Sequence, residues 1–362
     1  MGLPNVGKST FFNALTKNAV PAANYPFCTI DPAVGIVAVP DERLEILAKF
    51  TGSKKIIPAA IEFVDIAGLV EGAASGQGLG NQFLSHIRET DAILEMVRIF
   101  PITGSGDDIT HVYGTVDPLR DIGVINMELM LADLQTVDKR LANIGRDAKR
   151  GDKDAVLEFG LLERLKTALE AGRMANTVIP TDEEVKAYKQ LNLLTTKKFI
   201  YGLNKRSGVD NLDKTDAVKF SELTKAIEAM GSQWVVIDAK LEDELKEFEG
   251  AEKDAFRETY GEHEDGVRDL IKACYKLLDL ETYLTTGPEE TRAWTIAKNS
   301  TAPVAAAAIH TDFQNKFIRA EVVFWQDLID AGSYGEARAR GKVRIEGKEY
   351  IVKDGDVIEF RI

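Results

Sequence analysis

The stretch MGLPNVGKST, residues 1–10, decides the fold of this chain. Its Gly-x-x-x-x-Gly-Lys-Ser spacing is typical of a loop whose backbone N–H groups surround phosphate oxygens. In such a loop Lys8 supplies positive charge to the outer phosphates, and the Ser9 hydroxyl can ligate Mg²⁺. Residues 10–16 look helical, and a helix N-terminus favours bound anions, so the stretch predicts an α/β nucleotide-binding domain rather than a chance glycine loop. The residues expected to contact nucleotide here are Asn5, Val6, Gly7, Lys8, Ser9 and Thr10.

A second motif follows the apolar run of residues 61–64, which reads as a buried strand. Asp65 at the end of this strand is placed to hold Mg²⁺ through water, and the Gly68 N–H can turn toward a γ-phosphate. The Asp-x-x-Gly pattern is common by itself. Downstream of a phosphate-binding loop it predicts a nucleotide hydrolase with Gly68 among its catalytic groups.

Two loops have the composition of nucleotide-sensing segments. In residues 24–35, NYPFCTIDPAVG, the Thr29 hydroxyl can add a second ligand to the metal, although a plain surface threonine is the alternative. Residues 71–84 are rich in glycine, which suits a second switch segment or an ordinary flexible loop. The predicted metal ligands are therefore Ser9, Thr29 and Asp65.

The group that orients the attacking water is not obvious in this sequence. A glutamine follows the Asp-x-x-Gly glycine in Ras-like enzymes, but here Leu69 occupies that position and cannot polarise water. Gln77, His86 and His111 are the candidates. His111 lies in an acid- and glycine-rich loop where a mobile imidazole can approach the nucleotide, and a merely solvated histidine is the alternative.

The predicted base-binding elements follow two further apolar strands. Asn204-Lys205-Arg206-Ser207 stands where related hydrolases have Asn-Lys-x-Asp, so a hydroxyl replaces the carboxylate that grips guanine. Strong guanine specificity is therefore hard to support. Asp238-Ala239-Lys240 follows the second strand, where backbone N–H groups contact the base unless this is an ordinary strand-to-helix turn. The residues predicted to bind the base are Asn204, Lys205, Asp238, Ala239 and Lys240.

Composition limits the classes of protein that this chain can be. Its 362 residues, 44% hydrophobic and 28% charged, suffice for two or three domains, with no apolar run of about 18 residues and no signal-peptide pattern. Only Cys28 and Cys274 are present, which suits a reducing cytoplasm. The net charge of −13 argues against general adhesion to nucleic acid, so any RNA contact must be local.

The middle and the end of the chain differ from the nucleotide-binding part. Apolar residues Leu134, Val137, Leu141 and Ile144 have helical spacing, and a second helix is expected over residues 156–169, so a helical hairpin is predicted. Basic side chains near its turn form either an RNA-facing patch or a solvated face. They are Lys139, Arg140, Arg146, Lys149, Arg150 and Lys153. Beyond residue 281 the segments are short and β-rich, and Trp294 is expected in their core.

Long phrases of this sequence resemble the YchF or Obg-like ATPase family, ribosome-binding P-loop ATPases of the translation-factor-related GTPase class. The resemblance spans nearly the whole chain. It is carried by residues 2–16, 24–35, 65–84, 109–122, 292–313 and 347–360. It implies a P-loop G-domain with an inserted antiparallel helical hairpin and a C-terminal β-grasp (TGS) domain. It also implies ATP preferred to GTP, the hydrophobic residue seen at Leu69, and hydrolysis through a loop histidine at His111. The Asn-x-x-Glu of the family is absent at residues 204–207.

The resemblance further implies the following organisation. We expect G-domain segments over residues 1–116 and 196–280, the hairpin over 117–195 and the TGS domain over 281–362. Family members carry an apolar strand before the phosphate loop, so we expect such a strand upstream of Met1. The expected partner is the ribosome (50S and 70S), bound through the hairpin and the TGS domain by a cytoplasmic monomer with no membrane contact. A nucleotide-binding ribosomal scaffold and a metabolic P-loop kinase are the rival functions.

Overall fold

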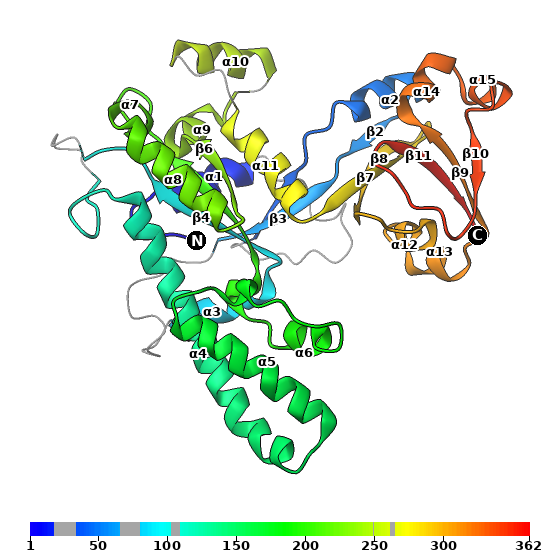
Figure 1. The fold of residues 1–362 in the computed structure, drawn as a ribbon. Helices are drawn as coiled ribbons and strands as arrows, with labels where there is room; N and C mark the ends of the chain where they lie inside the picture. Colours follow the sequence, from blue (N-terminus) through cyan, green and yellow to red (C-terminus); the bar gives the residue numbers. More distant parts are fainter. Residues whose placement is uncertain (18–33, 66–79, 103–108, 249, 261–264) are drawn as a thin grey trace. The chain divides into compact units, whose positions relative to one another are not determined.

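The computed structural model describes residues 1–17, 34–65, 80–102, 109–248, 250–260 and 265–362 (Figure 1). The chain divides into two compact units. We call Met1–Ala14 with Val64–Gly266 the P-loop unit, and Leu15–Phe63 with Val267–Ile362 the C-terminal unit. The domain boundaries predicted from the sequence remain a prediction.

A parallel three-stranded sheet forms the centre of the P-loop unit. Its order is β4 (Ala92–Arg98), β5 (Lys198–Asn204) and β6 (Gln233–Ile237). The strands are nearly continuous apolar runs, as expected for strands covered on both faces. Met1 lies alongside β4, because its amino group donates to the Leu94 carbonyl at 2.7 Å and its carbonyl accepts from the Met96 N–H at 2.8 Å. The phosphate loop therefore starts beside the sheet.

The helices of the P-loop unit lie before, between and after these strands along the chain. Helix α1 (Lys8–Lys17) starts inside the phosphate-loop motif, which confirms the helix predicted there. Helix α4 (Pro118–Lys149) packs against β4, and α8 (Ala217–Ala229) packs against β6. The remaining helices of this unit are α3 (Gly80–Glu89), α6 (Val185–Gln190), α7 (Leu212–Thr215), α9 (Ala239–Leu245) and α10 (Gly250–Thr259), with short 3₁₀ turns at Ala175–Thr177 and Leu194–Thr196.

The predicted helical hairpin is confirmed as α4 (Pro118–Lys149) and α5 (Lys153–Glu170), which lie side by side in Figure 1. The Asp117 side chain caps α4 by accepting from the Arg120 N–H, and Asp152 caps α5 in the same way. Both helices contribute buried apolar side chains to one cluster. They include Met130, Val137, Ile144, Leu161, Leu162 and Leu165.

A buried carboxylate joins this hairpin to the segment that leads into β5. Asp133 of α4 accepts hydrogen bonds from the N–H groups of Leu194 and Thr195, both at 2.8 Å, and from the Thr195 hydroxyl at 2.7 Å. Burial raises the pKa of Asp133, and the three hydrogen bonds act in the opposite direction. The carboxylate thus satisfies three donors that water does not reach.

The C-terminal unit contains a mixed sheet in the order β10-β9-β11-β7-β8-β2. The first hairpin, β7 (Leu280–Thr286) and β8 (Glu290–Ala297), is antiparallel, and the last strand, β11 (Asp356–Arg361), lies parallel to β7. Strands β9 (Arg319–Phe324) and β10 (Arg344–Glu346) complete it. A hairpin, intervening helices and a central last strand parallel to the first form a β-grasp sheet, as predicted.

One strand of this sheet was not predicted. Residues Lys55–Ile57 form β2, the edge strand of this sheet, which pairs in parallel with β8. A separate two-stranded sheet consists of β1 (Val34–Ala38) and β3 (Ala60–Val64).

Trp294, which was expected in the core, is half-buried. Its ring packs against the core, and its Nε1 donates to Thr285 Oγ1 at 2.9 Å.

The helices of the C-terminal unit complete the description. They are α2 (Arg43–Thr51), α11 (Gly266–Leu277), α12 (Ala302–Ala306), α13 (Thr311–Asn315), α14 (Trp325–Ala331) and α15 (Tyr334–Ala339). Across the described part of both units, none of the helices combines the length and apolar character needed to cross a bilayer.

Replacing Asp133 with alanine should lower the free energy of unfolding by about 3 kcal/mol, because three buried donors lose their acceptor. Asp138→Ala is the matched control on the same helix. Its side chain is 47% exposed and pairs with Lys166, so a change of less than about 1 kcal/mol is expected. Urea unfolding curves measure both values, and equal losses for the two variants would contradict this role of Asp133.

Candidate nucleotide-binding site

The phosphate loop has a backbone that requires glycine at both glycine positions of its motif, Gly2 and Gly7. Gly2 and Gly7 have φ angles of +148° and +99°, which residues with a side chain rarely adopt. A Cβ at Gly2 would lie 2.5 Å from the Met96 carbonyl oxygen, and one at Gly7 would lie 2.3 Å from Asn204 Nδ2. Both conformational strain and lack of space therefore exclude other residues.

Asn204 braces the phosphate loop from the end of β5. Its buried side chain donates from Nδ2 to the Val6 carbonyl at 2.8 Å and accepts at Oδ1 from the Ala239 N–H at 3.0 Å. Three segments that are distant in sequence are thus joined by one amide. The predicted base-binding residue Asn204 has a structural role, and the N–H of Ala239 is already partnered in this arrangement.

Lys8 and Asp65 lie close enough to interact electrostatically. The Lys8 ammonium donates to the Leu3 carbonyl at 2.7 Å, within the loop itself. Burial lowers the pKa of Lys8, and the Asp65 carboxylate opposes this shift. A backbone carbonyl is a weaker partner for an ammonium than a phosphate is, so the lysine is held where it can exchange one for the other.

The donor set available for Mg²⁺ is partly within the described residues. Ser9 is exposed in the first turn of α1, and Asp65 directly follows β3. A hydroxyl and a carboxylate are oxygen ligands of the kind that Mg²⁺ takes together with phosphate oxygens. These two residues fit the metal. Thr29, Gly68, Leu69 and Gln77, which the sequence also singled out, lie outside the described residues.

At the base-binding end, Ser207 is tied to Asp238. One carboxylate oxygen of Asp238 accepts from both the Ser207 N–H and the Ser207 hydroxyl at 2.6 Å, and the other caps α9 through the Leu241 N–H at 2.9 Å. Lys205 continues the connection, its N–H donating to the Ile237 carbonyl at 2.8 Å. Lys240 is exposed, and its Nζ lies 3.6 Å from Glu244 Oε1. The pairing of Ser207 with Asp238 was not predicted from the sequence.

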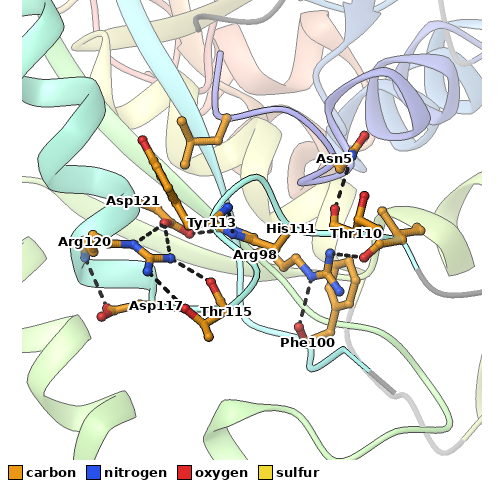
Figure 2. Close-up of polar contacts among 12 residues, drawn as sticks. Asn5, Arg98, Phe100, Thr110, His111, Tyr113, Thr115, Asp117, Arg120 and Asp121 are labelled. Carbon is orange, nitrogen blue, oxygen red and sulfur yellow. Dashed lines mark hydrogen bonds and ion pairs between the residues drawn. The ribbon is translucent and has the colours of Figure 1, made fainter. Parts of the chain in front are cut away.

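His111 is buried, so the alternative of a merely solvated histidine is wrong, while its catalytic role stays a prediction. Its Nε2 lies 2.9 Å from Asp121 Oδ2, and its Nδ1 accepts from the Tyr113 N–H at 3.3 Å (Figure 2). The side chain is 0% exposed. His86, the other described candidate, is exposed on α3. Asp121 carried no sequence signal, because an acid in the first helical turn is common.

The segment that carries His111 is attached to the phosphate loop. Asn5, which has a φ of +63°, donates from Nδ2 to the Thr110 carbonyl at 3.2 Å (Figure 2). Arg98 at the end of β4 holds the same segment by donating to the Ile109 carbonyl at 2.8 Å. Thr110, the residue before His111, therefore contacts the phosphate loop.

A glycine-dependent phosphate loop between sheet and helix, with a lysine within electrostatic range of a carboxylate, defines a P-loop nucleotide-binding protein of the GTPase class. Residues 1–150 match a family model described as "50S ribosome-binding GTPase". Residues 280–362 match the model YchF-GTPase_C, described as "Protein of unknown function (DUF933)".

Full-length relatives are similar to this chain. "Ribosome-binding ATPase YchF" of Bacillus subtilis (strain 168) is 51% identical over 100% of this chain and 97% of the relative. The protein of the same name from Escherichia coli O157:H7 is 46% identical, over 99% and 97%. The solved Schizosaccharomyces pombe YchF GTPase superposes with a TM-score of 0.85 at 36% identity, covering 100% of this chain and 96% of the other. The chain belongs to the YchF family.

Replacing Gly7 with alanine should lower affinity for a fluorescent ATP analogue more than tenfold, because the new methyl group displaces Asn204. The control is Gly52→Ala, at the end of α2. That glycine has a φ of +65° but nothing within 4 Å of an added Cβ, so it tests backbone strain without a clash. Native affinity in the Gly7→Ala protein would show that the Asn204 brace does not shape the site.

Proposed function

We propose that this protein is a Mg²⁺-dependent ATPase that binds the ribosome and acts as a translation- or stress-linked molecular switch in the cytoplasm. The observation that carries the proposal is the phosphate loop braced by Asn204, with the Lys8 ammonium held on the Leu3 carbonyl of that loop. The names of the full-length relatives, each a ribosome-binding ATPase, support it.

The proposed reaction is attack of water on the γ-phosphate of the nucleotide. Backbone N–H groups of the loop and the Lys8 ammonium neutralise charge that develops on the phosphate oxygens. Ser9 and Thr29 would hold Mg²⁺ directly, and Asp65 through water. When bound, Mg²⁺ supplies further positive charge at the phosphates. The Gly68 N–H would contact the γ-phosphate, and His111 would orient the water, because Leu69 cannot.

We propose ATP as the preferred substrate, with GTP as the alternative. A guanine-specific site needs a carboxylate that accepts from two donors of the base. The only carboxylate bonded to Ser207 in the described site, that of Asp238, accepts from Ser207 and caps α9. The base would therefore lie against Asn204, Lys205 and the backbone of residues 238–240 without a guanine-specific partner.

The proposed ribosome contact uses the hairpin together with the β-grasp sheet of the TGS domain. Lys139, Arg146, Lys149 and Lys153 are exposed on the hairpin. Arg140 is partly neutralised, because its Nε lies 2.5 Å from Glu158. Exposed cations on an acidic protein suit local contact with RNA in the 50S subunit or the 70S ribosome. A monomer would suffice for this contact.

A second function rests on a specific observation. Both ring nitrogens of His111 are engaged, and a resting protein in this state would bind nucleotide with little hydrolysis. Such a protein would be a nucleotide-binding ribosomal scaffold. Multiple-turnover phosphate release, measured with and without ribosomes, separates the scaffold from the ATPase.

Replacing Lys8 with alanine should lower kcat/KM for ATP by about a hundredfold or more. The reason is that the transition state loses the positive charge of the ammonium that stabilises the γ-phosphate oxygens. Lys49→Ala is the control, since Lys49 is exposed on α2. Phosphate release by both variants is the measurement. Native turnover in the Lys8→Ala protein would reject the hydrolase assignment.

When unlabelled ATP or GTP competes with labelled ATP for the site, ATP should bind at least tenfold more tightly than GTP. The physical reason is the missing carboxylate at position 207, without which guanine N1–H and N2–H₂ lack a bidentate acceptor. Equal competition would remove the adenine preference from the proposal and leave the nucleotide hydrolase standing.

A further inference from the structure

Asp121 is a buried carboxylate in the first turn of the hairpin helix α4, and it meets the imidazole of His111 (Figure 2). Their side chains are 5% and 0% exposed, and Nε2 lies 2.9 Å from Oδ2. The carboxylate has no role in the reaction proposed above. It nevertheless holds the residue on which that reaction would depend for positioning water.

The hydrogen bonds define which ring nitrogen carries the proton. Because Nδ1 of His111 accepts from the Tyr113 N–H, a neutral ring has its proton on Nε2, which donates to Asp121. Both nitrogens are therefore used. With the side chain fully covered, no water can reach either nitrogen while this arrangement persists.

We propose that Asp121 is a positioning residue that stores His111 in an inactive site, and that hydrolysis requires the His111–Asp121 hydrogen bond to break. The inference rests on the proposed function, in which His111 orients the attacking water. It differs from an Asp–His pair that acts together on a substrate, because such a pair leaves the distal ring nitrogen open to the reacting group.

The stored arrangement is held by partners that can be exchanged. Arg120 donates from Nε and Nη2 to the second oxygen of Asp121, at 3.3 and 3.1 Å, and its guanidinium lies 4.6 Å from the centre of the Tyr113 ring. Burial raises the pKa of Asp121, and His111 and Arg120 oppose this shift. Because Arg120 also donates to the carboxylate, Asp121 keeps a partner when its hydrogen bond to His111 breaks, and we call the His111–Asp121 hydrogen bond the latch.

The latch lies between two parts of the molecule that can act on it. On one side, Asn5 of the phosphate loop donates to the carbonyl of Thr110, which precedes His111. On the other, Asp121 belongs to the helix that extends to the turn of the hairpin at Lys149. A displacement of either element changes the geometry of the same hydrogen bond.

The test compares ATP hydrolysis by the full chain carrying Asp121→Ala or Asp121→Asn with Asp117→Asn. Asp117 is the matched control, because it lies one turn earlier, caps the same helix and has no contact with His111 among its hydrogen bonds, and asparagine also caps. We expect Asp121→Ala to raise kcat about threefold to tenfold with KM nearly unchanged, because a larger fraction of the protein has a free imidazole. Asp121→Asn should have a smaller effect in the same direction, since a neutral acceptor bonds less strongly.

Histidine NMR provides the readout that a general loss of stability would not give. The chain has four histidines, so ring-labelled protein gives four imidazole signals, and His111→Ala assigns the relevant one. We expect this signal to move to the position of a solvent-exposed imidazole in the Asp121→Ala protein. If that variant does not fold, Asp121→Asn carries the comparison.

The outcomes separate this inference from the proposed function. An unchanged or lower kcat with a shifted His111 signal would overturn storage by Asp121, and so would an unmoved signal in both variants. Loss of turnover in His111→Ala would in either case leave the role of His111 intact. Native turnover in His111→Ala would instead reject that role, whatever the Asp121 variants do.

Discussion

One side-chain amide holds the nucleotide site together. Asn204 ends a central strand, and its two polar atoms reach the phosphate loop at Val6 and the start of α9 at Ala239. The amide fits only because Gly7 has no Cβ. A loop that contains several unusual φ angles would relax without such a brace, so the geometry around the phosphates depends on a contact made almost two hundred residues away.

At this site, the groups that would bind the nucleotide are in place, but the histidine proposed to assist hydrolysis is not free. The loop, Lys8 and Asp65 are arranged for a triphosphate, whereas the only described histidine attached to this loop is buried against α4. A site of this kind can hold a nucleotide for some time before cleaving it. The proposed switch, in a family whose members are named ribosome-binding ATPases, would need His111 to leave this buried position before hydrolysis.

Local patterns predicted much of the fold. The P-loop spacing predicted α1, apolar runs predicted β3, β5 and β6, helical spacing predicted the α4–α5 hairpin, and the short β-rich segments predicted the β-grasp sheet. What the sequence did not predict depends on contacts between distant residues. The edge strand β2 needs β8 to pair with, and Ser207 meets Asp238 across a separation of 31 residues. The burial of His111 was missed for a different reason, since a polar, glycine-rich loop gives no local sign that a carboxylate ten residues later will enclose it.

The central claim is that residues 2–9 surround a Mg²⁺-bound nucleoside triphosphate. Calorimetric titration of the full-length protein with a non-hydrolysable ATP analogue tests it most directly, with Mg²⁺ present and then removed by chelation. The account predicts saturable heat at one site per chain that weakens when Mg²⁺ is removed. No heat with any nucleoside triphosphate, from protein that is folded by circular dichroism, would contradict it.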